Sequence, residues 1–228
     1  MTELGLRYQA IVDRIATAAT SHNRAVDDLT VVVVTKNNPH QLVLDLLNLG
    51  SRDFGENRDQ EAAPKAKQIA LESDKSFNWH FIGQLQTNKV KSVLEYAHFL
   101  HSLDRSSLLD ELKKRTIDRE VPLRVFVQVN LTDDPERGGV AASDLMAFSE
   151  RVLDSPGLEL VGLMGVGGLA VAPEGEFEKL AILSQEIQKL APSAAGLSMG
   201  MSGDFETAIA YGATHLRIGT AITGNRPN

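Results

Sequence analysis

The sequence predicts an α/β fold, a single (β/α)8 barrel of the TIM type with an extra helix at its amino terminus, spanning residues 1–228 as one domain. Strand-like and helix-like patterns alternate along the whole chain, which is the order expected of a parallel sheet covered by helices. Eight predicted strands are separated by seven helices, and 228 residues suit such a barrel with few insertions. A doubly wound open sheet is the alternative.

The individual elements follow from periodicity and from helix-end signals. Apolar residues recur at helical spacing over 3–21, and the valine run 31–34 predicts a strand over 30–35 that is buried on both faces. We expect Asn38 to cap the next helix, Pro39 to be its first residue and Gly50 to end it. The remaining strands are expected at 51–55, 78–82, 98–103, 123–130, 158–164, 196–199 and 214–218, and the remaining helices at 57–71, 87–96, 105–119, 143–154, 175–190 and 204–211.

Two further expectations concern coverage and mobility. The segment after the last strand has too few residues to form a full helix, so the amino-terminal helix is expected to cover that part of the barrel. Glycine and proline concentrate in loops 131–139 and 165–175, which makes these the segments expected to be most mobile.

Composition excludes several function classes. A net charge of −7 opposes binding to a phosphate backbone, so nucleic acid is not an expected partner. The absence of cysteine excludes disulfides, thiol catalysis and thiolate metal sites, and no spacing of His, Asp and Glu resembles a metal site. No apolar stretch reaches the length of a signal segment or a membrane span, so we expect a cytoplasmic protein without membrane attachment.

Lys36 stands directly after the valine strand, at the end where parallel folds keep their chemistry. A lysine partly shielded from water carries its free amine form more often, and a free amine can condense with an aldehyde. The alternative is a strand-end lysine whose charge extends into solvent.

Other polar or unusual residues fall at the carboxyl ends of the predicted strands, which converge on one mouth in a barrel. They are Asn57, Gly83, Ser102, Asn130, Met164, Ser198 and Arg217. Each has a structural alternative: Asn57 as a helix cap, Ser102 and Asn130 as turn partners, Arg217 in a surface ion pair. His80 is a candidate acid or base at the mouth, with a packed, hydrogen-bonded histidine as the alternative.

Two segments after the last two strands suit a phosphate group. Residues 198–203 (SMGMSG) and 217–220 (RIGT) each offer backbone N–H groups, small residues and a hydroxyl near a helix start. Barrels often bind phosphate at this position. Together with a lysine at the end of the first strand, these segments predict a ligand that is a phosphorylated aldehyde, whose two ends need different partners. Pyridoxal 5′-phosphate (PLP) fits this description.

The chain resembles the YggS/PROSC family of PLP-binding proteins, whose fold is similar to the amino-terminal barrel of alanine racemase. The resemblance runs nearly end to end and includes VVVVTKNNP around Lys36, DFGENRDQE, WHFIGQLQTNK, LSMGMSGDFETAI and HLRIGTAITGNR. It implies a Schiff base between PLP and Lys36, with Asn57 beside the cofactor. It also implies phosphate contacts from Ser198, Met199, Gly219 and Thr220, and Arg217 facing the pyridine nitrogen.

Two functions remain open. The resemblance implies a noncatalytic protein of PLP (vitamin B6) homeostasis, expected to be a monomer whose partners are PLP and PLP-dependent apoenzymes. The alternative is a PLP-dependent amino-acid racemase. Racemisation needs an acid or base on each face of the substrate, and Tyr8, Tyr96 and Tyr211 are all predicted on helices or their ends, away from the mouth. The sequence therefore favours binding over catalysis.

Overall fold

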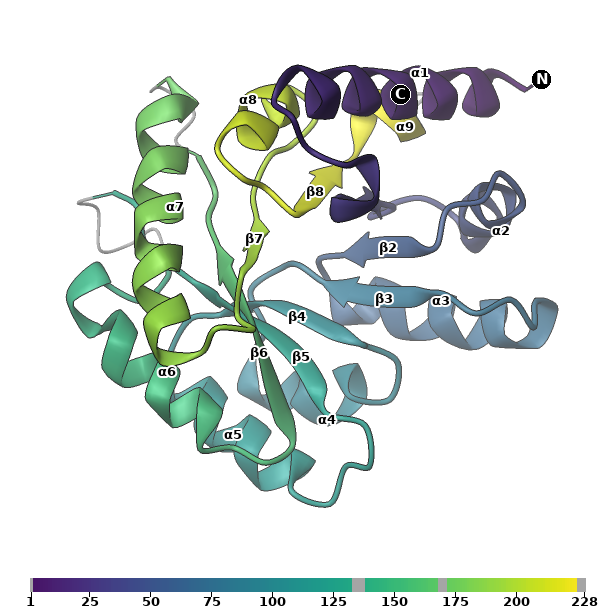
Figure 1. Ribbon diagram of the computed structural model, residues 1–228. Coiled ribbons are helices and arrows are strands. Elements are labelled where there is room, and N and C mark those ends of the chain that lie inside the picture. The colour runs from purple at the N-terminus through teal and green to yellow at the C-terminus, as the bar shows by residue number, and fades with distance from the viewer. Residues whose placement is uncertain (1, 133–137, 168–171, 225–228) are drawn as a thin grey trace.

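The computed structural model describes residues 2–132, 138–167 and 172–224, and its eight parallel strands close into a barrel in the order β1 to β8 (Figure 1). The strands are β1 (Thr30–Val34), β2 (Asp53–Glu56), β3 (Asn78–Phe81), β4 (Phe99–Leu103), β5 (Leu123–Gln128), β6 (Leu158–Met164), β7 (Gly196–Ser198) and β8 (His215–Ile218). Strand β1 pairs with both β2 and β8, which closes the barrel. The predicted (β/α)8 fold is confirmed.

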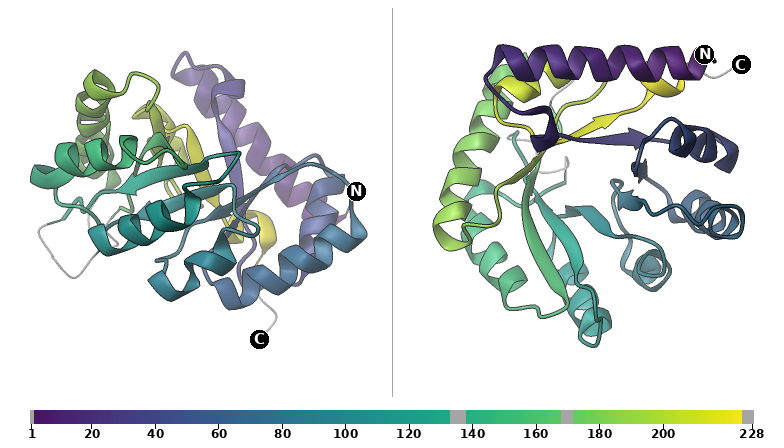
Figure 2. Two further views of the ribbon diagram at one scale, coloured as in Figure 1. Left: turned by 90° about the horizontal axis from the view of Figure 1, so that it is seen from below. Right: turned by 45° about the vertical axis from the view of Figure 1, so that its right-hand side comes forward.

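Helices cover the outside of the barrel (Figure 2). They are α1 (Glu3–Ser21), α2 (His40–Asn48), α3 (Asp59–Glu72), α4 (Val90–Val93), α5 (Ser106–Thr116), α6 (Leu145–Leu153), α7 (Pro173–Leu190), α8 (Phe205–Ala210) and α9 (Thr220–Thr223). A large apolar layer fills the space between helices and strands, whereas a small cluster of Phe99, Phe126 and Met164 lies separate from it.

Helix α1 packs across α8 and the short α9, as Figures 1 and 2 show. Its buried residues Ile11, Ile15 and Ala18 belong to the predicted apolar stripe. The Arg7 guanidinium donates from Nε to the Ile222 carbonyl at 2.9 Å, which ties α1 to α9. The expectation that the amino-terminal helix covers the gap after the last strand is therefore confirmed.

Several predicted helix bounds differ from the structure, among them the starts of α2, α3, α6 and α7 and the length of α4. Helix α2 begins at His40 with Pro39 in the N-cap position, and the Asn38 amide donates to the Lys36 carbonyl at 3.0 Å instead of capping the helix. Helix α3 begins at Asp59 rather than at residue 57. Its predicted neighbour over 87–96 contains only a 3-10 turn and the four residues of α4, because the chain must return to β4 at Phe99.

Gly50 ends α2 as predicted. Its φ of +99° is a conformation that glycine adopts without steric cost, and its N–H donates to the Leu47 carbonyl at 3.2 Å. The centres of the two loops expected to be mobile, 133–137 and 168–171, lie outside the described residues.

Candidate functional site

Lys36 lies at the mouth of the barrel, two residues beyond the end of β1. A Cβ added to Gly55 would come within 3.1 Å of Val32 and 3.4 Å of Val34, so these valines point into the barrel, whereas Val33 packs in the outer layer. Because side chains alternate along a strand, Lys36 continues the inward series. Its side chain is exposed, so the partial shielding from water expected from sequence is not present among the described residues.

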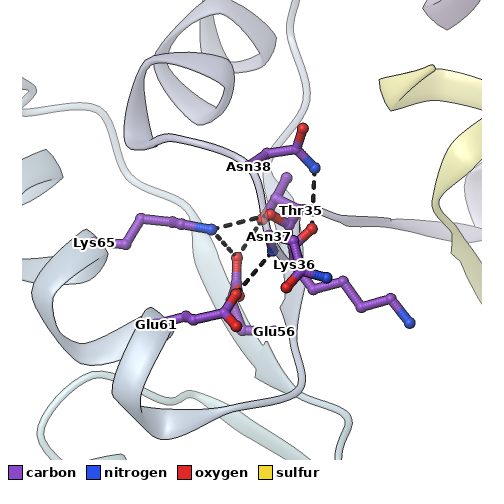
Figure 3. A network of polar contacts seen from close by, with 7 residues as sticks. All are labelled: Thr35, Lys36, Asn37, Asn38, Glu56, Glu61 and Lys65. Carbon is purple, nitrogen blue, oxygen red and sulfur yellow. Dashed lines mark hydrogen bonds and ion pairs between the residues drawn. The ribbon is translucent and has the colours of Figure 1, made fainter. Parts of the chain in front are cut away.

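A buried ion pair lies beside the residue that precedes Lys36 (Figure 3). The Lys65 ammonium is 2.5 Å from Glu56 Oε1 and donates to the Thr35 carbonyl at 3.0 Å. The Thr35 hydroxyl donates to the same Glu56 oxygen at 2.7 Å. Burial raises the pKa of Glu56, and the contacts with Lys65 and Thr35 oppose that rise. These bonds fix the end of β1 to α3.

The residue that follows Lys36 is also held by α3. Asn37 has a φ of +62°, and its N–H donates to Glu61 Oε2 at 2.9 Å. Figure 3 shows the Lys36 side chain directed away from Lys65 and the two glutamates. Both neighbours of Lys36 are thereby fixed, and its amine projects from a turn with a defined backbone.

Asn57 follows β2 and is the next candidate around the mouth. Its side-chain oxygen Oδ1 is buried without a hydrogen-bond partner in the described structure, and it does not cap α3. A Cβ on Gly83 would lie 2.2 Å from the Asn57 carbonyl oxygen, so only glycine allows this approach of the two loops. Beside them opens a hollow of about 610 Å³ whose lining includes Asn57, Arg58, Glu61, Gly83 and Lys89.

Arg217 reaches inward from β8 and is 6% exposed. Its Nη1 donates to the Ser198 hydroxyl at 2.7 Å and to the Ser198 carbonyl at 2.6 Å, and its Nη2 donates to the Gly165 carbonyl at 2.9 Å. Burial lowers the pKa of Arg217 to about 10, so the guanidinium remains charged at neutral pH. The alternative of a surface ion pair is wrong, and the sequence-predicted Ser198 and Arg217 lie in direct contact.

The segments after β7 and β8 meet at the start of α9. The backbone N–H groups of Gly219 and Ala221 both point at the Ser202 hydroxyl oxygen, at 3.2 and 3.4 Å. Thr220, the first residue of α9, is exposed. Two N–H groups converging on one oxygen form an arrangement that suits a phosphate oxygen.

Met199 does not contribute an N–H group to this arrangement. Its backbone N–H donates to the His215 carbonyl at 3.2 Å, and its side chain is fully buried in the outer apolar layer. The described geometry therefore favours Ser202, which was not among the predicted site residues, over Met199 as a phosphate contact.

The remaining candidates make contacts within the protein. The Ser102 hydroxyl donates to the Gly83 carbonyl, and the Asn130 side chain accepts from the Thr132 N–H at 3.0 Å. Met164 packs with Phe99 and Phe126. His80 is 1% exposed inside the barrel, where it is hydrogen-bonded rather than open to the mouth.

The three tyrosines occupy helices or helix ends, as predicted. Tyr8 lies in α1, Tyr211 follows α8, and Tyr96 follows α4 and packs on Trp79 in the outer layer. Its hydroxyl lies 3.4 Å from Asp59 Oδ1. The pKa of Tyr96 is raised by burial and by the Asp59 charge, so it holds its proton near neutral pH.

The residues at the mouth fit a phosphorylated aldehyde with a ring nitrogen. The accessible amine of Lys36 lies just after β1, the buried cation of Arg217 lies on β8, and the pair of convergent N–H groups follows β8. Strands β1 and β8 are neighbours. The Asn57 side-chain oxygen, which has no hydrogen-bond partner in the described part of the chain, adds an acceptor just after β2, the other neighbour of β1. PLP would need these partners for its aldehyde, pyridine nitrogen and phosphate.

The described ranges contain neither a metal site nor a membrane-spanning helix. Among residues 2–132, 138–167 and 172–224, no group of three or more His, Cys, Asp and Glu side chains is placed to hold a metal ion. In the same ranges, none of the helices combines the length and the apolar character needed to cross a membrane.

The fold and the site define a (β/α)8 barrel of the alanine racemase type, with a lysine at the end of its first strand. The chain belongs to the family described as "Alanine racemase, N-terminal domain", whose family model matches residues 6–227. Similar proteins include the "Pyridoxal phosphate homeostasis protein" of Mycobacterium leprae, 37% identical over 98% of this chain and 93% of the relative. The protein of the same name from Escherichia coli K12 is 33% identical over 99% of this chain and 98% of the relative.

Similar solved structures share the barrel fold of this chain. A protein from Bifidobacterium adolescentis superposes with a TM-score of 0.88 at 28% identity, covering 96% of this chain and 94% of that one. PipY of Synechococcus elongatus, in a structure with PLP bound, has a TM-score of 0.80 at 29% identity, covering 91% and 99%. Alanine racemase of Corynebacterium glutamicum, at 15% identity and a TM-score of 0.68, shares the fold over 95% of this chain and 61% of its own length.

Proposed function

We propose that this chain is a PLP-binding protein of intracellular PLP homeostasis, acting as one domain over residues 1–228. The relatives named for PLP homeostasis match nearly the whole chain, and PipY binds PLP on a similar barrel. The observation that carries the proposal is the exposed Lys36 between the Asn57 loop on one side and the N–H pair before and within α9 on the other.

In this proposal the Lys36 amine condenses with the PLP aldehyde, forming a C=N bond with loss of one water molecule. Gly219, Ser202 and Thr220 bind the phosphate, with Ser198 reaching the ligand through Arg217. The guanidinium of Arg217 faces the pyridine nitrogen. Bound PLP supplies an aldehyde that is protected from reaction with cellular amines, and the protein controls its release.

We propose that the chain holds and passes on the cofactor rather than turning over a substrate. The support is the position of Tyr8, Tyr96 and Tyr211, which lie in or at the ends of outer helices and offer no second acid or base at the mouth. The expected partners are PLP-dependent apoenzymes, and the protein is expected to act as a monomer in the cytoplasm, where it can meet them.

Titration with PLP, followed by visible absorption, tests this function. The wild-type protein is expected to turn yellow and to pass PLP to an added apoenzyme, whereas Lys36→Ala is expected to lose the visible band and remain folded. A wild-type protein that binds PLP no better than pyridoxal, or that racemises amino acids at enzymatic rates, would contradict the proposal.

A further inference from the structure

A continuous row of hydrogen-bonding side chains crosses the interior of the barrel. His80 Nε2 lies 2.9 Å from Asp53 Oδ1, and His80 Nδ1 lies 2.9 Å from His101 Nε2. His101 Nδ1 then lies 2.7 Å from the Ser198 hydroxyl, which accepts from Arg217 at 2.7 Å. The row starts at the first residue of β2, crosses β3 and β4, and ends on β7 and β8. It therefore joins one end of the barrel interior to the candidate site.

The donor and acceptor properties of these side chains determine where the protons in this row lie. Arginine only donates, so the Ser198 oxygen accepts from Arg217 and its own proton is free for His101 Nδ1. A neutral His101 then carries its proton on Nε2 and donates to His80 Nδ1. His80 in turn carries its proton on Nε2 and donates to the Asp53 carboxylate. Every donor meets an acceptor in this direction.

The reverse direction requires a protonated Asp53. Burial pushes the pKa of Asp53 upward, but hydrogen bonds from His80 and Asn78 and the nearby histidines outweigh burial, and the pKa is lowered. Burial lowers the pKa values of His80 and His101, so both rings are neutral near neutral pH. The carboxylate is charged and the rings are neutral, which selects a single direction for the row.

We infer that Asp53, His80 and His101 are positioning residues that act through Ser198 to hold Arg217 in a fixed orientation for its ligand. The Ser198 oxygen is kept as an acceptor because its proton is committed to His101. The two Nη1 bonds to Ser198 and the Nη2 bond to Gly165 use three of the five N–H groups of Arg217. Two N–H groups remain for a ligand within the described structure, and the plane of the guanidinium is set.

A comparison with His215 distinguishes the positioning role of His101 from the packing of its aromatic ring. Its ring centroid lies 6.2 Å from that of His80 and 6.1 Å from that of His101, so it shares the same aromatic cluster. Its Nδ1, however, pairs with the Thr214 hydroxyl at 2.8 Å and takes no part in the row. Replacing His101 by phenylalanine removes a link and keeps a ring, whereas the same change at His215 keeps every link.

The inference about Arg217 rests on the proposed function, but the row itself can be tested without PLP. Nitrogen NMR of the histidine rings in the PLP-free protein is expected to show neutral His80 and His101, both with the proton on Nε2. Protonated rings, or protons on Nδ1, would overturn the assignment. A wild-type protein that shows these tautomers but does not bind PLP would refute the proposed function and leave the row intact.

Its action on the ligand is tested with the matched pair His101→Phe and His215→Phe. We expect His101→Phe to move the pyridine nitrogen resonance of bound, ring-labelled PLP and to weaken PLP binding roughly fivefold, the effect of one neutral hydrogen bond. His215→Phe is expected to change neither. If the two variants behave alike, the effect comes from ring packing alone, and the inference is wrong. If His101→Phe fails to fold, Asp53→Ala at the partly exposed end of the row is expected to abolish the single tautomer pattern, and an unchanged pattern would also overturn the inference.

Discussion

The Lys65 ammonium lies 2.5 Å from Glu56 Oε1 and 3.0 Å from the Thr35 carbonyl oxygen, so a buried ion pair on α3 and β2 holds the backbone immediately before Lys36. Both side chains are nearly inaccessible to water, at 6% and 1% exposure. The ion pair cannot be predicted from the linear sequence, because its two residues meet only when β2 and α3 are folded together.

Lys65→Met is therefore expected to lower the free energy of unfolding by about 3–5 kcal/mol, because it leaves the Glu56 carboxylate buried without its partner. The double variant Glu56→Gln/Lys65→Met should recover much of that loss. The exposed Lys67 on the same helix provides the control, and Lys67→Met should change stability by less than about 0.5 kcal/mol. Urea denaturation measures all three. Equal stabilities for the two single variants would refute a structural role of the pair.

The α9 N–H pair gives a prediction about the phosphate. A Cβ at Gly219 would meet Val34 Cβ at 3.6 Å, an ordinary contact, so Gly219→Ala is expected to fold. The added methyl group would obstruct the approach of a phosphate to the backbone, and PLP binding should weaken much more than pyridoxal binding. Titrations of both ligands make the comparison. Equal losses for PLP and pyridoxal would remove the phosphate assignment.

Arg217 predicts the electronic state of the bound cofactor. A charged guanidinium has no acceptor, so a pyridine nitrogen facing it should accept a hydrogen bond and remain unprotonated, which makes the ring a poor electron sink. Exchange of the α-proton of amino acids for deuterium should accordingly be absent or marginal. Nitrogen NMR with ring-labelled PLP reads the protonation state directly.

Three results would contradict the predicted role of Arg217. A protonated pyridine nitrogen, or rapid exchange with racemisation that disappears in Lys36→Ala, would favour the racemase. An Arg217→Ala variant whose cofactor spectrum and affinity match the wild type would show that this arginine does not face the ring.

The buried histidines predict an acid-dependent loss of stability. Burial lowers the pKa of His215 to about 3 and also lowers those of His80 and His101, from an unfolded value of 6.5. On acidification the unfolded chain takes up protons that the folded protein excludes, so stability is complete above 6.5 and falls as the pH drops below it. His215 alone contributes roughly 1.4 kcal/mol per pH unit in that window.

Urea denaturation between neutral pH and about pH 5 measures this slope. The pKa of Glu56 is raised, which has the opposite sign above its unfolded value of 4.5 and reduces the net slope at the acid end. His215→Phe should show a shallower slope than the wild type. Stability that does not change over this range would contradict the assignment of neutral buried rings.

Much of the fold follows from local patterns. The valine run, the amphipathic stripe of α1 and the glycine that ends α2 each act within a few residues, and each was predicted. Strand β2 lies two residues later than expected at its start and α4 is shorter, because strand pairing and the return to β4 set those limits. Tertiary contacts override periodicity at such places.

Some features of the site could likewise be predicted from local patterns, and others could not. The positions of Lys36 and Arg217 at strand ends could be predicted because strand alternation and the barrel mouth place them. The roles of Glu56, Lys65 and His101 could not be predicted, because their partners lie on other elements of the fold. Ser202 carries a weak signal, a hydroxyl within a glycine-rich turn, but only the turn geometry selects it over Met199.

We propose above all that Lys36 binds the PLP aldehyde covalently. Borohydride reduction of the PLP-loaded protein, followed by proteolysis and mass spectrometry, locates the attached group among all lysines of the chain. We expect a pyridoxyl group on the peptide that contains Lys36 and none on that peptide in Lys36→Ala. A pyridoxyl group found on another lysine, or on no lysine, would contradict it.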